Sequence, residues 1–514
     1  MNMITRRLAL GIVSMSVASF ALGGSAMATD DGTPQPGGTL TMALHADVNS
    51  LDPANATGLA ALYLANILYD PLVTLAEDGS LQPGLATSWT TPDATTIKLK
   101  LRDDVVFHDG TPFNAEAVKF NLDRFKAGRL GRFLRAIDSV AADGEFEVTI
   151  KLKQDDPAVL PTLYELARQA GAMASPTAVQ KEGDSFGLNP VGTGPYTFVS
   201  WTRDQEMVFN KNTKYWGDKG PYVDKLVLRP IPDEATRTNQ LRSGDLDIIY
   251  QVQPKDLLLL QRAADIKVVE RPSNGWDVVL FNDQASILKN PDVRRALSLA
   301  VNRQEITDGL FMGSGSPGQG PIAPSHPGYR KDFYSIPAQG NIEEAKALLA
   351  KAGVKEGTKI RLGTPQIPRF EQIAQLVQQD WRKIGIDATI ERFETSVGLE
   401  QLATGNFEAV AWYYTGHPDL DGVTSNLFDS KGVNNNWTNY KNPEVDDLLR
   451  KGRTEADMSK RIGYYQKAEE LIMADSAICV VHYYDEIYAY RSNVHGLAVR
   501  SDSILNLRGV WKSQ

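Results

Sequence analysis

The sequence predicts an α/β protein with more than one lobe, and three observations support this prediction. Runs of alternating apolar and polar residues, the pattern of half-buried strands, occur at 97–102, 146–153 and 225–229. Between such runs lie longer stretches in which apolar residues return every three or four positions, as in an amphipathic helix. The chain has 514 residues, more than one hydrophobic core usually holds, so we expect two or three lobes.

The N-terminal segment has the features of an export signal. Arg6 and Arg7 precede an uncharged apolar stretch at 8–22, and Ala-Met-Ala at 26–28 matches a cleavage site. The apolar stretch has about fifteen residues, short of the ~20 that a membrane-spanning helix needs. We therefore expect residues 1–28 to be a signal peptide that is removed. The mature chain would then reach the periplasm of a Gram-negative bacterium, through the general or the twin-arginine export route.

Strands and helices alternate in the first half of the mature chain. Asn114 precedes apolar residues at Val118, Leu122 and Phe125, so we expect it to cap a helix, with Glu116 near the positive end of that helix. The other expected elements are a strand at 39–44, a helix at 60–68, and strands at 97–102, 146–153, 197–201, 207–210, 225–229 and 266–270.

The second half continues the same alternation. Asn290 and Pro291 suit the cap and first turn of a helix whose apolar face carries Val293, Leu297 and Val301. The other expected elements are amphipathic helices at 342–353 and 370–384, and strands at 360–363, 387–392, 408–412 and 478–484.

Charge and cysteine usage narrow the functional classes. The net charge of −9 and the pI near 5.4 argue against nucleic-acid binding, because phosphate binding needs a basic face. None of the six histidines pairs with another at metal-ligand spacing, and Cys479 has no second cysteine as a partner. We therefore predict no metal and no cofactor.

The sequence also carries no motif of a known catalytic centre. It has no phosphate-binding GxxxxGK and no HExxH zinc helix. The pattern GxSxG occurs at 183–187, but no expected strand leads into it, as a nucleophile turn requires. Residues 313–318 match the dinucleotide pattern GxGxxG, but an expected helix precedes them and Pro317, Pro321 and Pro324 prevent a helix after them, so we expect a loop. We predict that the protein is not an enzyme. A hydrolase or peptidase is the rival class, and it would need an activated nucleophile.

Large aromatic residues stand beside turns at the ends of expected strands. Trp412, Tyr413 and Tyr414 precede a turn-rich segment, Trp276 precedes an apolar run, and Trp437 follows three asparagines. Such residues often line ligand clefts in α/β proteins. Packing at the edge of a sheet is the alternative role for each of them.

Several motifs follow one another in a recognisable order along the chain. They are LRDDVVFHDGTPFNAEAV at 101–118, NPVGTGPY at 189–196, KYWG at 214–217, PDEATR at 232–237 with SGDLD at 243–247, and NPDVRRAL at 290–297 with VNR at 301–303. Together they resemble the motifs of extracellular solute-binding protein family 5, whose members serve importers of peptides, nickel, glutathione and opines. The resemblance covers nearly the whole mature chain.

This resemblance implies a two-lobed periplasmic binding protein fold with an extra subdomain and a central ligand cleft that closes by a hinge. The implied division gives lobe I residues 29–72, 195–285 and 499–514, subdomain II residues 73–194, and lobe III residues 286–498. It also implies an inner-membrane ABC permease with its ATPase subunits as partners. We expect the protein itself to be a monomer.

The resemblance further implies a peptide or peptide-like ligand of the oligopeptide, dipeptide or glutathione type. Peptide-binding members tend to hold the α-amine with an aspartate in the turn after the aromatic strand, where this chain has Gly416 and His417. This departure argues against the hypothesis that the ligand is a simple dipeptide. Opines, other amino-acid conjugates, and nickel or metal chelates are the alternative ligands.

The candidate ligand residues combine the aromatics with polar groups beside them. We expect Arg369 to clamp an anion and Asp419 to accept an amine, because a buried charge needs a partner. The full set is Ala46, Asp47, Trp276, Asn282, Arg369, Trp412, Tyr414, His417, Asp419 and Trp437.

Overall fold

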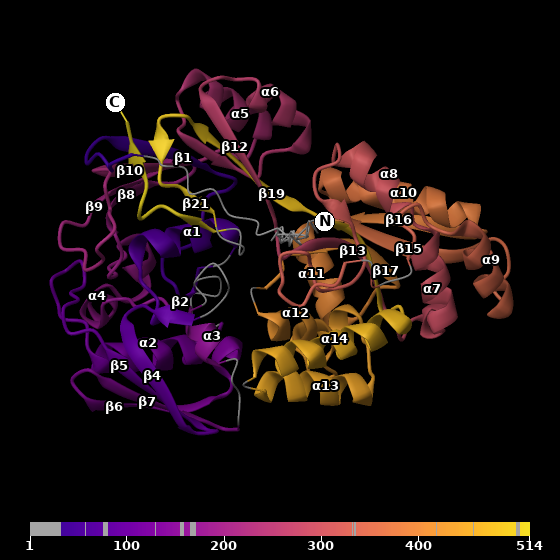
Figure 1. The fold of residues 1–514 in the computed structure, drawn as a ribbon, viewed down its shortest axis with the longest axis horizontal. Coiled ribbons are helices and arrows are strands. Elements are labelled where there is room, and N and C mark those ends of the chain that lie inside the picture. The colour runs from indigo at the N-terminus through magenta and orange to yellow at the C-terminus, as the bar shows by residue number, and fades with distance from the viewer. Residues whose placement is uncertain are drawn as a thin grey trace, which may run out of the picture. The chain divides into compact units, whose positions relative to one another are not determined.

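A computed structural model describes residues 32–513 except 57, 76–80, 129, 155–158, 165–170, 332, 334–335, 418, 456 and 500–503. The predicted signal peptide at 1–28 lies outside these residues. Pro34–Gln514 forms one unit, and the description below concerns that unit (Figure 1).

The first sheet has seven strands in the order β12-β19-β11-β1-β10-β9-β8. Strand β1 runs parallel to β10 and β11, whereas the remaining pairs are antiparallel. Helix α1 (Leu59–Leu68) packs in its main hydrophobic core, and α5 (Glu234–Ser243) and α6 (Leu257–Gln261) contribute to a smaller one. The strands are β1 Thr39–Leu44, β8 Tyr196–Thr202, β9 Glu206–Lys211, β10 Lys225–Pro230, β11 Ile248–Tyr250, β12 Ile266–Pro272 and β19 Asp485–Arg491.

A smaller antiparallel sheet has the order β4-β5-β7-β6 and its own core. Helix α2 (Ala115–Ala127) packs on it and starts as predicted, because the Asn114 side chain accepts a hydrogen bond from the Ala117 N–H at 3.0 Å. Strands and helices here are β2 Val73–Leu75, β3 Leu81–Pro83, β4 Ala86–Asp93, β5 Thr96–Leu101, β6 Ile137–Gly144, β7 Glu147–Leu152, α3 Val159–Tyr164 and α4 Pro176–Glu182, with 3₁₀ turns η1 Gly131–Leu134 and η3 Gly183–Leu188.

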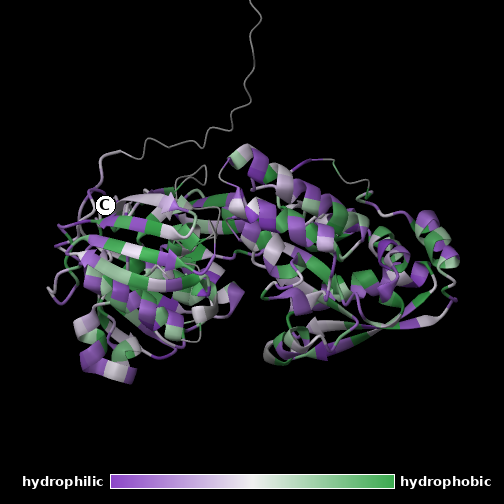
Figure 2. Ribbon diagram, turned by 90° about the horizontal axis from the view of Figure 1, so that it is seen from below, coloured by the Kyte–Doolittle hydropathy of each residue, from purple (hydrophilic) through white to green (hydrophobic). Residues whose placement is uncertain are grey.

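The third sheet has six strands in the order β14-β18-β13-β17-β15-β16. Strand β13 (Trp276–Phe281) is buried on both faces, so side chains alternate between two cores: Val279 and Phe281 enter one, and Val278 and Leu280 enter the other. Figure 2 shows many hydrophobic residues on the strands and mixed hydropathy on the helices. The other strands are β14 Ser316–Pro317, β15 Thr358–Pro365, β16 Ile386–Phe393, β17 Ala409–Tyr414 and β18 Ile478–Tyr483.

Helices cover both faces of this sheet. Helices α7 (Pro291–Ala300), α9 (Ile342–Lys351) and α10 (Pro368–Lys383) belong to one core, and the Asn290 side chain caps α7 as predicted, accepting from the Asp292 N–H at 3.0 Å. The remaining helices are α8 Arg303–Glu305, α11 Thr395–Thr404, α12 Leu420–Phe428, α13 Pro443–Thr454 and α14 Met458–Ala474, with short turns η4 Pro254–Asp256, η5 Ser286–Lys289, η6 Ile306–Leu310 and η7 Asn435–Trp437. Short pairs β20 Val494–His495 with β23 Trp511–Lys512, and β21 Ala498–Val499 with β22 Leu505–Asn506, complete the elements.

The chain crosses between the large sheets twice. It crosses at 273–275, between β12 and β13, and again at Tyr484, between β18 and β19. The predicted boundaries gave β13 to lobe I and β19 to lobe III, whereas hydrogen bonding puts β13 in the six-stranded sheet and β19 in the seven-stranded one. Strand pairing therefore places the crossings at 273–275 and 484, and not at the implied boundaries after residues 285 and 498.

Asp70, which is fully buried, lies where several of the family-like motifs meet. Its carboxylate accepts hydrogen bonds from the Tyr215 hydroxyl (3.0 Å), the Trp216 indole N–H (2.8 Å) and the Thr193 hydroxyl (3.1 Å), and it forms an ion pair with Arg508 (2.6 Å). The KYWG and PVGTGPY motifs thus have a structural role here, because both supply hydrogen-bond donors to the buried Asp70 carboxylate.

The two glycines of PVGTGPY are required for steric reasons. A Cβ atom on Gly194 would lie 2.4 Å from the Leu68 carbonyl carbon, and one on Gly192 would lie 2.1 Å from the Leu68 oxygen. Only glycine lets the two segments approach this closely. Among the described residues, no helix is both long enough and apolar enough to span a bilayer.

Candidate functional site

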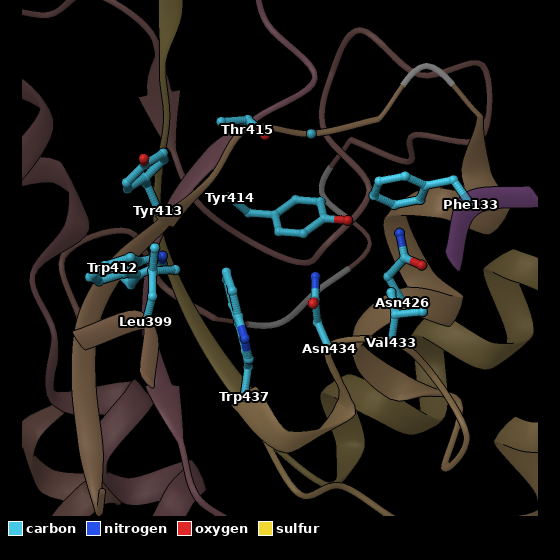
Figure 3. Close-up of a pocket in the computed structure, with 11 residues that line it drawn as sticks. Phe133, Leu399, Trp412, Tyr413, Tyr414, Thr415, Asn426, Val433, Asn434 and Trp437 are labelled. Carbon is cyan, nitrogen blue, oxygen red and sulfur yellow. The ribbon is translucent and has the colours of Figure 1, made fainter. Parts of the chain in front are cut away.

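A cavity of about 230 Å³ lies at the end of strand β17 (Figure 3). Three consecutive residues of β17, Trp412, Tyr413 and Tyr414, form one wall. In Figure 3 the Tyr414 ring projects across the middle of the group, and Asn434 points toward it from below. The complete lining is Phe133, Leu399, Trp412, Tyr413, Tyr414, Thr415, Gly416, Asn426, Val433, Asn434 and Trp437.

Ring packing holds the aromatic wall. The register of β13 and β17 sets Trp276 opposite Tyr414, and the two rings stack with centroids 4.9 Å apart. The Trp437 ring meets Trp412 edge-on at 6.3 Å, and the Tyr414 hydroxyl donates to the Gly422 carbonyl at 2.8 Å. These contacts fix the rings before any ligand arrives.

Several polar side-chain groups of the lining residues are available to form hydrogen bonds with a ligand. Within the described part of the chain, no protein partner accompanies the Asn434 side-chain amide, the Trp437 indole N–H or the Tyr413 hydroxyl. The Asn426 amide nitrogen donates to the Gly422 carbonyl at 2.8 Å, which leaves its side-chain oxygen open. Among the described residues, those that line the cavity include no Asp, Glu, Lys, Arg or His.

The turn after β17 explains why no acidic residue faces the cavity from position 416. Gly416 has a φ of +78°, and a Cβ atom there would lie 2.3 Å from the Asn274 carbonyl group. Both the backbone conformation and the space therefore require glycine. The aspartate expected from peptide-binding relatives has no equivalent at this position.

Asp419, for which the sequence predicts contact with a ligand amine, is paired with Arg461 in the structure. Its carboxylate receives two hydrogen bonds from Arg461, each 2.7 Å long, and it caps α12 by accepting from the Asp421 N–H at 2.8 Å. Burial alone raises the pKa of Asp419, but the hydrogen bonds and charge of Arg461 outweigh burial and hold that pKa below its usual value. The His417 ring nitrogen Nδ1 accepts from the Asp419 N–H at 3.0 Å. Neither side chain lines the cavity.

Arg369 likewise faces a protein anion. Its Nε and Nη2 atoms donate to the Asp277 carboxylate, the Nε bond being 3.2 Å long, and its guanidinium lies 4.7 Å from the Tyr484 ring centroid. Asp277 is fully buried. The sequence predicts an anion clamp at Arg369, but Asp277 already balances this charge.

The remaining predicted residues lie around the cavity or away from it. Trp276 is fully buried behind Tyr414, with its indole N–H donating to the Pro321 carbonyl at 2.9 Å. Asn282 donates to the Gly405 and Phe407 carbonyls, so it fastens a loop. Asp47 accepts from the Trp201 indole at 3.1 Å, and neither it nor its neighbour Ala46 lines the cavity. The structure thus brings together Trp412, Tyr414 and Trp437 from the predicted set.

His326 gives the region behind this turn a pH dependence. It is buried, and its Nε2 atom has no hydrogen-bond partner among the residues that the structure describes. Burial, helped by the positive potential of His417, lowers its pKa to about 4. In the unfolded chain the imidazole takes up a proton near pH 6.5. The neutral buried form therefore contributes full stability above pH 6.5, and this contribution is lost as the pH falls toward 4.

We expect His326→Leu to flatten the acid side of the stability profile. Between pH 7.5 and 4.5 the native chain should lose about 2 kcal/mol more unfolding free energy than the variant, since only the native chain must protonate this imidazole on unfolding. Urea unfolding at a series of pH values measures this difference. Parallel profiles for the two proteins would contradict the assignment.

No metal centre is found in the part of the chain that the structure describes. No group of three or more His, Cys, Asp or Glu side chains is placed to hold an ion there. Cys479 is buried in β18, with the Arg303 guanidinium 3.2 Å from its Sγ atom.

Comparison with known proteins bears on both the fold and the family. The model of the bacterial extracellular solute-binding proteins, family 5 Middle, matches residues 80–435. The glutathione-binding protein GsiB of Escherichia coli K12 is 28% identical over 512 residues, covering 96% of each chain.

Two solved structures of similar proteins contain a bound ligand. The periplasmic binding protein DppA of Helicobacter pylori, in complex with the peptide STSA, superimposes with a TM-score of 0.81 at 26% identity, covering 93% of this chain and 99% of DppA. AgaA from A. tumefaciens R10, in complex with agropinic acid, gives a TM-score of 0.79 at 26% identity, with the same coverage of each chain. The fold is therefore the two-lobed α/β fold of periplasmic binding proteins, and the chain belongs to family 5 of the bacterial extracellular solute-binding proteins.

Proposed function

We propose that this protein is the periplasmic binding component of an ABC importer and that its ligand is a peptide or a peptide-like molecule of the glutathione type. The observation that carries this proposal is the aromatic cavity at the end of β17, in a chain of this family. GsiB, which binds glutathione by its name, and DppA, which holds a peptide, support the ligand class.

The proposed mechanism is closure around the ligand. Phe133, which packs on the core of the four-stranded sheet, lines the cavity together with residues from the six-stranded sheet and its helices. A ligand that touches both sides stabilises the closed arrangement by its differential contacts. The two crossings, at 273–275 and Tyr484, are the segments that absorb the rotation. The closed, monomeric form would then dock on the permease.

The cavity supports a carrier in preference to a catalyst. Its lining has no Ser, Cys, His, Lys, Asp or Glu, so the residues that line it offer no nucleophile paired with a base. A bound peptide is expected to leave the protein chemically unchanged.

The proposal predicts saturable stabilisation by peptides. After ligand removal by unfolding and refolding, a tripeptide or glutathione at 100 times its Kd should raise the unfolding free energy by about 2.7 kcal/mol. Calorimetric titration should give one site per chain. Lack of any stabilisation or heat with both ligands, in protein that refolds fully, would contradict the proposed ligand class.

An opine is the second candidate, because AgaA holds agropinic acid at a similar level of identity. The same titration separates the candidates: an opine that binds at least 100-fold more tightly than any peptide would replace the peptide proposal. Stabilisation by a nickel chelate alone would instead favour a metal carrier.

A further inference from the structure

The cavity has the size of one part of a ligand. At about 230 Å³ it exceeds the roughly 150 Å³ of an engineered apolar cavity that accepts benzene. It falls below the ~300–1,000 Å³ of pockets that enclose a whole drug-sized ligand. One ring with its substituents therefore fits, and the rest of the ligand lies outside this cavity.

A charged group would find no counter-charge on the described residues that line the cavity. Taking an ammonium or a carboxylate out of water without a partner is costly. Of the charged residues that the sequence proposed for the ligand, Arg369 is paired with Asp277 and Asp419 with Arg461, and Asp47 does not line the cavity. The chemistry of the cavity therefore selects against ionised groups.

The walls suit a flat group with a polar edge. The Trp437 and Tyr414 rings offer aromatic surfaces on which such a group can stack. The open groups at the Asn434 amide and the Trp437 indole N–H can donate to or accept from such an edge. A purely aliphatic group would leave them unpaired, which costs free energy.

We infer that this cavity is a specificity subsite for an uncharged aromatic side chain with a hydrogen-bonding edge, such as that of tyrosine or tryptophan, in a peptide ligand. This inference rests on the proposed function and goes beyond it by naming the side chain that is selected. Neither peptide terminus is held here.

Tripeptides Gly-Xaa-Gly, with Xaa as Tyr, Trp, Gln, Glu, Lys or Ala, test the inference by calorimetric titration. The Tyr and Trp peptides should bind at least tenfold more tightly than the Glu and Lys peptides. Gln should bind more tightly than Glu, its charged isostere. Trp437→Ala should reduce the preference for Tyr over Ala to within threefold.

A pair of neighbouring variants supplies the control. Asn434→Asp puts a carboxylate on the lining and should weaken the Tyr peptide at least tenfold. Asn436→Asp makes the same chemical change two residues away, where the side chain is exposed and donates to the Ala403 carbonyl, and should leave the affinity within twofold.

Three outcomes would overturn the inference, and one of them would also refute the proposed peptide ligand. If all the peptides bind within threefold of one another, the subsite has no such specificity, while the proposed function stands. If no peptide binds to fully folded protein, the peptide ligand is refuted and the subsite falls with it. Equal losses in Asn434→Asp and Asn436→Asp would also contradict the assignment.

Discussion

Asp70→Ala is expected to lower the unfolding free energy by about 3–5 kcal/mol, because it leaves the Arg508 guanidinium without its partner in a buried site. The same change removes the acceptor of three further hydrogen bonds, from Thr193, Tyr215 and Trp216. These donors come from distant parts of the sequence, so the loss should affect several segments together. Urea unfolding followed by tryptophan fluorescence measures it.

An exposed carboxylate gives the matched control for Asp70. Asp447 pairs with Arg450 and Lys451 on the surface of α13, where all three side chains are at least 41% exposed. Exposed pairs contribute about 0–1 kcal/mol, so Asp447→Ala should change stability by less than about 1 kcal/mol. Equal losses of unfolding free energy in Asp70→Ala and Asp447→Ala would contradict the stabilising role of Asp70.

Arg461→Met is expected to cost a similar amount, about 3–5 kcal/mol, since it leaves the Asp419 carboxylate unpaired in a mostly buried position. Combining Arg461→Met with Asp419→Asn in one chain removes the orphaned charge. The double variant should therefore recover a large part of the lost stability. Chemical unfolding of the two single variants and the double variant gives the coupling free energy.

The Asp419 variants also separate a structural role from a ligand role. In our account Asp419→Asn lowers stability and leaves peptide affinity within about threefold, because Asp419 is held by Arg461 outside the cavity. If Asp419 holds the ligand amine, the outcome reverses. Affinity would then fall at least tenfold, while stability would change little.

The sequence predicts elements well where the signal is local. The caps at Asn114 and Asn290 can be read from a few residues, and the structure confirms both. Helix α13 has the same signal, an asparagine at 442 followed by Pro443, but it was not among the expected elements. The same asparagine–proline pair marks the start of this helix.

Helix α14 shows where pattern reading fails for a physical reason. Its buried face includes the apolar residues Ala468, Ile472 and Met473. Arg461 and Glu469 lie on the same face and interrupt the apolar pattern in the sequence. These polar residues are buried because they meet partners on other elements, such as Asp419 and the Ile322 N–H. Sequence periodicity cannot reveal such distant partners.

The candidate site likewise contains residues that a local sequence signal predicts and residues that only the folded chain brings together. The aromatic residues at the end of β17, with Trp437, could be predicted because they stand beside turns at strand ends. Arg369 and Asp419 looked like ligand residues, because their partners Asp277 and Arg461 are far away in the sequence. Phe133, Leu399 and Asn426 carry no local signal, since only the folded chain brings them to β17.

Native mass spectrometry of the protein, purified under non-denaturing conditions with any ligand that it carries, tests the central proposal most directly. We expect one small ligand per chain, with the mass of a peptide or a glutathione-type molecule, released unchanged when the protein unfolds. A sugar conjugate or a metal chelate in its place would contradict the account.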